Sequence, residues 1–178
     1  RVGFVFQSPR LIPWKTILKN VRFSLESDGS IPKNEWNEMA ERALELVGVA
    51  DFKEYFPNQL SGGMQTRAAI ARALAINPEI ILMDEPFSSL DEITGRRMRS
   101  ELLSIWERLH PTVVFITHDM LEAVFLAERV VLLTPRPMQV CTSFAIDVPR
   151  PRSYSDEALF HVQKQVLESF EQMWRETE

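Results

Sequence analysis

The chain alternates short apolar runs with longer stretches that repeat their apolar residues at a helical period. The run 80–83 is apolar at every position, which is typical of a strand buried on both faces. Such strands, alternating with helices, indicate an α/β fold with a mainly parallel sheet that helices cover on both sides. The predicted strands are 2–6, 80–83, 112–117 and 130–133, and the predicted helices are 16–25, 35–47, 62–76, 94–109 and 119–127.

The pattern changes beyond Pro135. Prolines are frequent there, and because proline is confined to edges and bulges of sheets, they predict an edge hairpin around 140–148. Residues 156–174 follow with apolar positions at helical spacing. We therefore expect one main domain, residues 1–135, and a C-terminal hairpin and helix, residues 136–178.

Composition narrows the function classes. The 178 residues carry 20 Lys and Arg against 25 Asp and Glu, a net charge of −5 that argues against a nucleic-acid partner. The single cysteine, Cys141, excludes an internal disulfide. No stretch reaches the roughly 18 consecutive apolar residues of a membrane span. The chain opens inside an apolar run, so we expect residues upstream of Arg1.

The triplet Ser61-Gly62-Gly63 stands at the start of a long, sparsely charged helix. Serine is a preferred N-cap, and glycines in the first turn leave bare N–H groups at the positive end of the helix dipole. Such a helix start can bind a phosphate group. An ordinary serine-capped helix remains the alternative interpretation of this triplet taken alone.

Polar residues also follow three of the predicted strands. Asp84 and Glu85 come at the end of one strand, His118 at the end of the next, and Gln7 at the end of the first. Open α/β sheets bind ligands at the carboxyl ends of their strands. An Asp there can hold Mg²⁺ beside nucleotide phosphates, and a Glu can deprotonate a water. Each residue alone could equally be a solvated strand end or a turn.

Together these groups resemble the motifs of an ABC transporter nucleotide-binding subunit, in the family's order. The resemblance implies a P-loop NTPase-type α/β fold with an inserted helical subdomain at about 13–76. The matching strings are Gln7 for the Q-loop, Leu60-Ser61-Gly62-Gly63-Met64-Gln65 for the signature, Ile80-Ile81-Leu82-Met83-Asp84-Glu85-Pro86 for Walker B, Ser88-Ser89-Leu90-Asp91 for the D-loop and Thr117-His118-Asp119 for the switch histidine.

Shorter strings are similar to importers of nitrate, aliphatic sulfonates and taurine. They are Leu11-Ile12-Pro13-Trp14-Lys15-Thr16, Asp84-Glu85-Pro86-Phe87, Ile105-Trp106, Glu122-Ala123-Val124 and Thr134-Pro135-Arg136-Pro137.

The resemblance implies ATP and Mg²⁺ as ligands and a role for each matched residue. Asp84 and Gln7 would hold Mg²⁺, Glu85 would be the general base, and His118 would contact the γ-phosphate. The signature residues Ser61, Gly62, Gly63 and Gln65, together with Asp91, would serve the ATP of a second subunit.

It also implies partners and a location. They are a second ATP-binding subunit, two membrane-spanning permease subunits and an external solute-binding protein, with this chain at the cytoplasmic face of the membrane. Trp14, in the loop after Gln7, would contact a permease subunit or pack in the core.

One family element is absent from the 178 residues: the Walker A loop, Gly-x-x-x-x-Gly-Lys-Ser/Thr. We therefore expect the chain alone neither to bind ATP tightly nor to hydrolyse it. We also expect an exposed apolar sheet to promote self-association, such as strand swapping. Two alternatives remain open, an ABC-type ATPase outside transport and a non-catalytic interaction domain.

Overall fold

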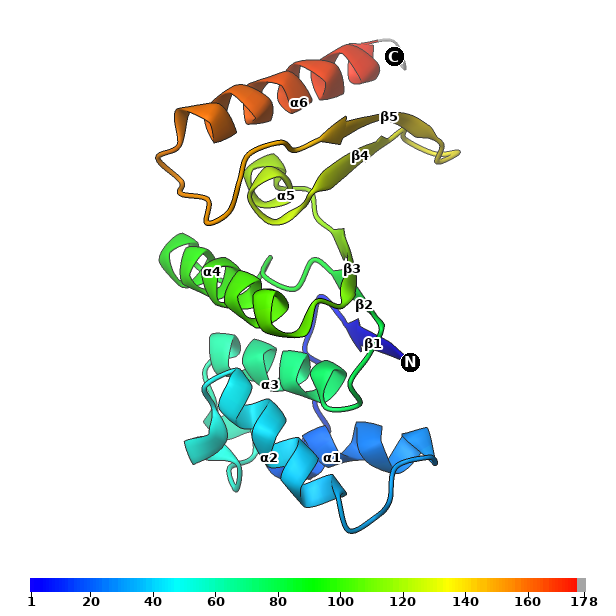
Figure 1. Ribbon diagram of the computed structural model, residues 1–178, viewed down its shortest axis with the longest axis vertical. Coiled ribbons are helices and arrows are strands. Elements are labelled where there is room, and N and C mark those ends of the chain that lie inside the picture. Colours follow the sequence, from blue (N-terminus) through cyan, green and yellow to red (C-terminus); the bar gives the residue numbers. More distant parts are fainter. Residues whose placement is uncertain (176–178) are drawn as a thin grey trace. The chain divides into compact units, whose positions relative to one another are not determined.

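The structure, a computed structural model, describes residues 1–175 and divides into two compact units, Arg1–Ile116 and Thr117 onward. The first unit contains a three-stranded sheet and the second a two-stranded sheet, as far as the described residues extend (Figure 1). No helix within residues 1–175 has the length and apolar character needed to cross a membrane.

The sheet of the first unit is parallel, as the sequence predicts. It consists of β1 (Val2–Val5), β2 (Ile80–Asp84) and β3 (Thr112–Ile116), in the order β1-β2-β3. β2 is the central strand, and its Ile80 pairs with Val2 on one side and Thr112 on the other. All three strands therefore end at the same edge of the sheet.

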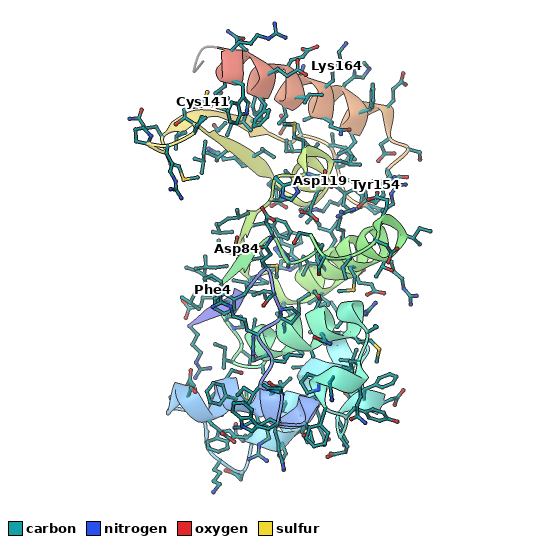
Figure 2. The ribbon with its side chains drawn as sticks, turned by 180° about the vertical axis from the view of Figure 1, so that it is seen from behind. Phe4, Asp84, Asp119, Cys141, Tyr154 and Lys164 are labelled. Carbon is teal, nitrogen blue, oxygen red and sulfur yellow. The ribbon has the colours of Figure 1, made fainter. Side chains whose placement is uncertain are left out.

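The two faces of this sheet differ in burial. Val5, Ile81 and Met83 point to one face and are 1–2% exposed. On the opposite face Phe4 is 39% exposed and Ile116 57% exposed. Figure 2 shows Phe4 and Asp84 on their neighbouring strands. The expectation of a sheet covered on both sides therefore holds for only one face among the described residues.

Three helices of the first unit pack on one another: α1 (Ile17–Asp28), α2 (Trp36–Leu46) and α3 (Gly62–Leu74) (Figure 1). Two 3₁₀ turns, Ala50–Phe52 and Pro57–Gln59, connect α2 to α3. α3 also packs on β1, which explains its sparse charge. Its buried residues are Thr66, Ala68, Ala69, Ile70, Ala71, Ala73 and Leu74.

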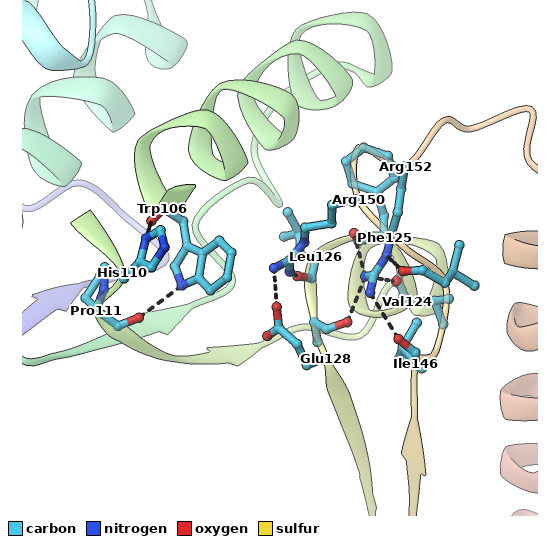
Figure 3. Close-up of polar contacts among 12 residues, drawn as sticks. Trp106, His110, Pro111, Val124, Phe125, Leu126, Glu128, Ile146, Arg150 and Arg152 are labelled. Atoms are coloured by element: carbon cyan, nitrogen blue, oxygen red, sulfur yellow. Dashed lines mark hydrogen bonds and ion pairs between the residues drawn. The ribbon is translucent and has the colours of Figure 1, made fainter. Parts of the chain in front are cut away.

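A fourth helix, α4 (Glu92–Leu109), connects β2 to β3. The indole nitrogen of Trp106 in its last turn donates a 3.0 Å hydrogen bond to the carbonyl of Pro111, the residue before β3 (Figure 3). This bond fixes the turn between helix and strand.

The second unit contains α5 (Met120–Leu126), β4 (Arg129–Leu133), β5 (Val140–Ala145) and α6 (Glu157–Arg175). β4 pairs with β5 in an antiparallel hairpin. The predicted strand 130–133 is therefore present, but among the described residues it pairs with β5 and not with the parallel strands. Alternate residues of β4 are buried, a pattern typical of antiparallel strands with one covered face.

A buried arginine, Arg152, connects α5 to the segment after β5 within the second unit. Arg152 is 8% exposed, and burial lowers the pKa of its guanidinium group. The guanidinium donates hydrogen bonds to carbonyls at the end of α5 and in the segment after β5 (Figure 3). The accepting residues are Val124 at 2.9 Å, Phe125 at 3.0 Å, Ala127 at 2.7 Å, Ile146 at 3.2 Å and Val148 at 2.9 Å.

Close contact between β1 and α3 predicts that Gly3 tolerates no side chain. A Cβ at residue 3 would lie 2.8 Å from the carbonyl oxygen of Ala73, which is rigid helix backbone. We expect Gly3→Ala to lower the free energy of unfolding by about 1–3 kcal/mol because the backbones must separate. Gly62→Ala is the control, because a Cβ there meets nothing within 4 Å. Urea unfolding measures both, and equal midpoints would contradict this packing.

We expect Arg152→Met to lower the free energy of unfolding by about 3 kcal/mol, because it leaves several carbonyls without a donor. Arg129→Met is the matched control, since Arg129 is exposed on β4, and it should change stability by less than about 0.5 kcal/mol. Thermal unfolding followed by circular dichroism measures both variants. A loss at Arg152 no larger than at Arg129 would show that the carbonyl contacts contribute nothing.

Candidate nucleotide-hydrolysis site

Two side chains that follow neighbouring parallel strands meet at the carboxyl edge of the sheet. Nε2 of Gln7, beyond β1, donates a hydrogen bond of 3.1 Å to Oε2 of Glu85, beyond β2. The register pairs Val5 with Met83, so Gln7 and Glu85 each lie two residues past this pair. The structure thus brings together two residues that the sequence places 78 positions apart.

The backbone of Glu85 is held on both sides. Its φ of 42° lies in the left-handed region, which costs a non-glycine residue on the order of 1–3 kcal/mol. Its N–H donates to the carbonyl of Ile116 at 2.9 Å, and its carbonyl accepts from the N–H and the hydroxyl group of Ser88 at 3.2 and 3.0 Å. Such strain persists only where the surroundings fix the residue, so the carboxylate leaves the sheet edge in a defined direction.

Asp84 is the last residue of β2 and shares the exposed face of the sheet with Leu82. Its carboxylate, with the Gln7 carbonyl oxygen that the bond to Glu85 does not use, supplies the oxygen ligands that suit Mg²⁺. Within residues 1–175 no group of three His, Cys, Asp or Glu side chains could hold a metal ion. Two oxygen donors are compatible with Mg²⁺, which usually keeps several waters and binds substrate phosphates besides one or two protein ligands.

The signature triplet forms the start of α3, as predicted. Ser61 is the N-cap, and its hydroxyl accepts a hydrogen bond from the N–H of Met64 at 3.4 Å. Gly62 is exposed, and the space where its Cβ would be is empty to 4 Å. A Cβ on Gly63 would lie 3.3 Å from Cγ2 of Thr94. An anion can therefore approach the first turn of α3 from the side of Gly62.

Gln65 points back to the segment before the triplet. Its Nε2 donates to the carbonyls of Pro57 at 2.9 Å and Leu60 at 3.2 Å. These bonds fix the turn that leads into Ser61. The residue thus has an architectural role that the motif alone does not reveal.

Asp91 is the N-cap of α4. Its Oδ1 accepts from the N–H of Thr94 at 3.0 Å, and hydrogen bonds from Thr94 lower the pKa of the Asp91 carboxyl group. The residue is exposed, and its carboxylate lies at the positive end of the dipole of α4.

His118 belongs to the second unit and is exposed. The hydroxyl of Thr117 accepts from the N–H of Asp119 at 3.0 Å, and Oδ1 of Asp119 caps α5 through the N–H groups of Leu121 and Glu122 at 2.9 and 3.2 Å. These bonds fix the backbone on either side of His118. Its position relative to Gln7 and Glu85 stays a prediction.

Two further polar residues of the first unit hold the loop after Gln7, and sequence reasoning did not assign them. Arg72 on α3 donates to the carbonyls of Pro9 and Arg10, at the start of the loop. The fully buried Asn20 on α1 forms hydrogen bonds with the N–H and the carbonyl of Ile12, nearer the end of the loop. Two sequence signals could have pointed to them. Arg72 is a lone charge in the alanine-rich stretch 68–75, and Asn20 falls among the apolar positions that α1 buries.

Comparison with known proteins shows which proteins this chain resembles. The family model described as ABC transporter matches residues 1–88, which include Gln7, the signature triplet, Asp84 and Glu85. Residues 1–88 thus match an ABC transporter domain, and the chain is similar to the ATP-binding proteins of that family.

Its similarity to the ABC family extends beyond those residues. An uncharacterised ABC transporter ATP-binding protein of Methanocaldococcus jannaschii is 49% identical over 165 residues, 93% of this chain and 61% of that protein. A nitrate import ATP-binding protein of Synechocystis is 46% identical over 147 residues, 83% of this chain and 55% of that protein. The chain thus spans about three fifths of these relatives.

A solved structure shares the fold. It is a dimeric ATP-binding cassette in a post-hydrolysis state bound to ADP and Pi, 37% identical with a TM-score of 0.68, covering 84% of this chain and 64% of that one. The α/β fold of ABC ATPase cassettes is therefore confirmed.

Proposed function

We propose that this chain is the main part of an ATP-hydrolysing subunit of an ABC importer. The observation that carries the proposal is the hydrogen bond between Gln7 and Glu85 at the carboxyl edge of a parallel sheet, beside Asp84. A carboxylate fixed by its backbone and contacted by a polar side chain from the next strand is suited to activate a water molecule.

Each residue has a distinct role in the proposed reaction. Glu85 accepts the proton of the attacking water. Gln7 orients Glu85 and, through its carbonyl oxygen, helps Asp84 to hold Mg²⁺. The ion neutralises charge on the β- and γ-phosphates when bound. His118 contacts the γ-phosphate.

The signature residues act on a second copy of the subunit. Ser61, Gly62 and Gly63 present the first turn of α3 to the γ-phosphate of the partner's ATP, and Gln65 holds the turn that shapes this surface. Asp91 lies beside the same interface. Support comes from the dimeric state of the solved cassette that contains ADP and Pi. ATP bound between two copies stabilises the dimer, and hydrolysis releases it.

The proposed transport role assigns the remaining partners. The nitrate import relative and the strings shared with sulfonate and taurine importers favour a small anionic or sulfonated solute. An external binding protein delivers it, and two permease subunits carry it, with this subunit at the cytoplasmic face of the membrane. Trp14 is 77% exposed in the loop after Gln7, which favours a permease contact over core packing.

Residues 1–135 then form most of the nucleotide-binding domain, with the helical subdomain at about 13–76, and residues 136–178 the C-terminal hairpin and helix. The motif of a Walker A loop, which cradles the α- and β-phosphates, does not occur in these 178 residues. We therefore propose that hydrolysis needs a longer chain, and that the 178 residues alone do not turn ATP over.

Glu85→Gln in the full-length protein tests the catalytic role. Glutamine keeps the size of the side chain and an oxygen that accepts from Gln7, but it cannot take a proton. We expect the steady-state ATPase rate to fall by about 10²-fold or more, with ATP affinity within threefold of the unsubstituted protein. An ATPase rate within threefold would refute the assignment of Glu85. Hydrolysis by the 178-residue chain alone, lost in Glu85→Gln, would refute the need for a longer chain.

A further inference from the structure

The loop between Gln7 and α1 is held at its start by one side chain of α3. The Nη2 group of Arg72 donates to the carbonyl of Pro9 at 2.8 Å, and its Nη1 group donates to the carbonyl of Arg10 at 2.7 Å. The two carbonyls belong to consecutive residues and lie 63 and 62 positions away in the sequence. A planar guanidinium group matches such a pair because its two N–H donors have a fixed spacing.

The residues that Arg72 holds are connected directly to Gln7. Only Ser8 separates Pro9 from Gln7, whose amide contacts Glu85. Arg10 has a left-handed backbone, φ 45°, and its guanidinium carbon lies 4.2 Å from the centre of the Phe6 ring. The loop therefore turns back on the end of β1, and a shift of Pro9 or Arg10 must displace Gln7.

The far end of the loop is held by α1. Oδ1 of Asn20 accepts from the N–H of Ile12 at 2.6 Å, and Nδ2 donates to the carbonyls of Ile12 at 3.1 Å and Lys15 at 3.0 Å. Between these residues lies the exposed Trp14. With Arg72 at one end and Asn20 at the other, the loop has little freedom to move independently of α1 and α3.

Arg72 itself is anchored on the helix that begins with the signature triplet. The hydroxyl of Ser24 on α1 donates to the backbone carbonyl of Arg72 at 2.8 Å. Partial burial also lowers the pKa of the guanidinium group. The hydrogen bonds to the loop offset the desolvation of this charge, so breaking them is costly.

We propose that Arg72 is a positioning residue that ties the loop carrying Gln7 to α3, so that Gln7 and the signature triplet move as parts of one body. A change at the start of α3, where the partner's ATP would bind, is then transmitted through Arg72 to the amide that orients Glu85. The catalytic part of this inference rests on the proposed function, whereas the mechanical part does not.

Amide hydrogen exchange in the full-length protein tests the mechanical part. The Ile12 amide donates to Asn20 on α1, and the Lys15 amide donates to the carbonyl of Ile12. We expect Arg72→Met to increase the exchange rates of both amides at least tenfold, because the loop loses its bonds to α3. Arg72→Lys should give a smaller increase, because an ammonium group can still donate to one of the two carbonyls, whereas methionine can donate to neither. Loop exchange within twofold of the unsubstituted protein in both variants would overturn the proposal.

Arg67→Met is the matched control for exchange. Arg67 lies on the same helix and also donates to a backbone carbonyl, that of Val47 at 2.8 Å, but it contacts no residue of the loop after Gln7 among its described bonds. We expect this variant to change exchange near Val47 and leave the loop unchanged. Equal loop exchange in the Arg67 and Arg72 variants would show general loosening of α3 and overturn a specific tether.

Steady-state ATPase measurements on the full-length protein test whether Arg72 acts through Gln7. We expect Arg72→Met to lower kcat about tenfold with KM for ATP changed less than threefold. In a Gln7→Ala background the same substitution should lower kcat less than twofold, because the group it positions is gone. A full tenfold loss in both backgrounds would overturn the positioning role. If the unsubstituted full-length protein does not hydrolyse ATP, the proposed function fails. The exchange measurements still show whether Arg72 holds the loop to α3.

Discussion

The register of β1 against β2 is the constraint on which the candidate site depends. Val5 pairs with Met83, so the chain delivers Gln7 and Glu85 to the same edge of the sheet at the same height. Because side chains alternate between faces, a slip of one residue would move Val5 from the buried face to the exposed one. Burial of Val5, Ile81 and Met83 therefore fixes the register, and the same register fixes the contact between the two polar side chains.

α3 connects that sheet edge to the signature triplet. Its close approach to β1 at Gly3 leaves no room for a side chain, and its small residues let α1, α2 and the sheet pack around it. α3 thus has the exposed Gly62 at its start, and near its end Arg72 holds the loop after Gln7. The same buried helix therefore connects the signature triplet, proposed to act on the partner's ATP, with the loop that carries Gln7.

The sequence predicts much of this architecture for identifiable reasons. Continuous apolar runs predict the three parallel strands, and polar residues directly after them mark the carboxyl edge, so Gln7 and Glu85 could be placed there from sequence alone. The sequence also predicts the strand at 130–133, but not its antiparallel pairing, because a short apolar run does not show whether its partner is parallel. The roles of Arg72 and Arg152 depend in part on backbone carbonyls 62 and 28 positions away, which no local pattern reveals. Asn20 bonds carbonyls only four to eight positions away, but those bonds depend on how the loop folds.

The central claim is that Gln7 acts on hydrolysis through Glu85, and the coupling between the two residues in single-turnover ATP hydrolysis by the full-length protein tests it most directly. The account predicts that Gln7→Ala slows hydrolysis about tenfold when Glu85 is present and less than twofold when residue 85 is glutamine, since the base that Gln7 orients is then missing. An equal loss in both backgrounds would contradict the account, because it would show that Gln7 acts independently of Glu85.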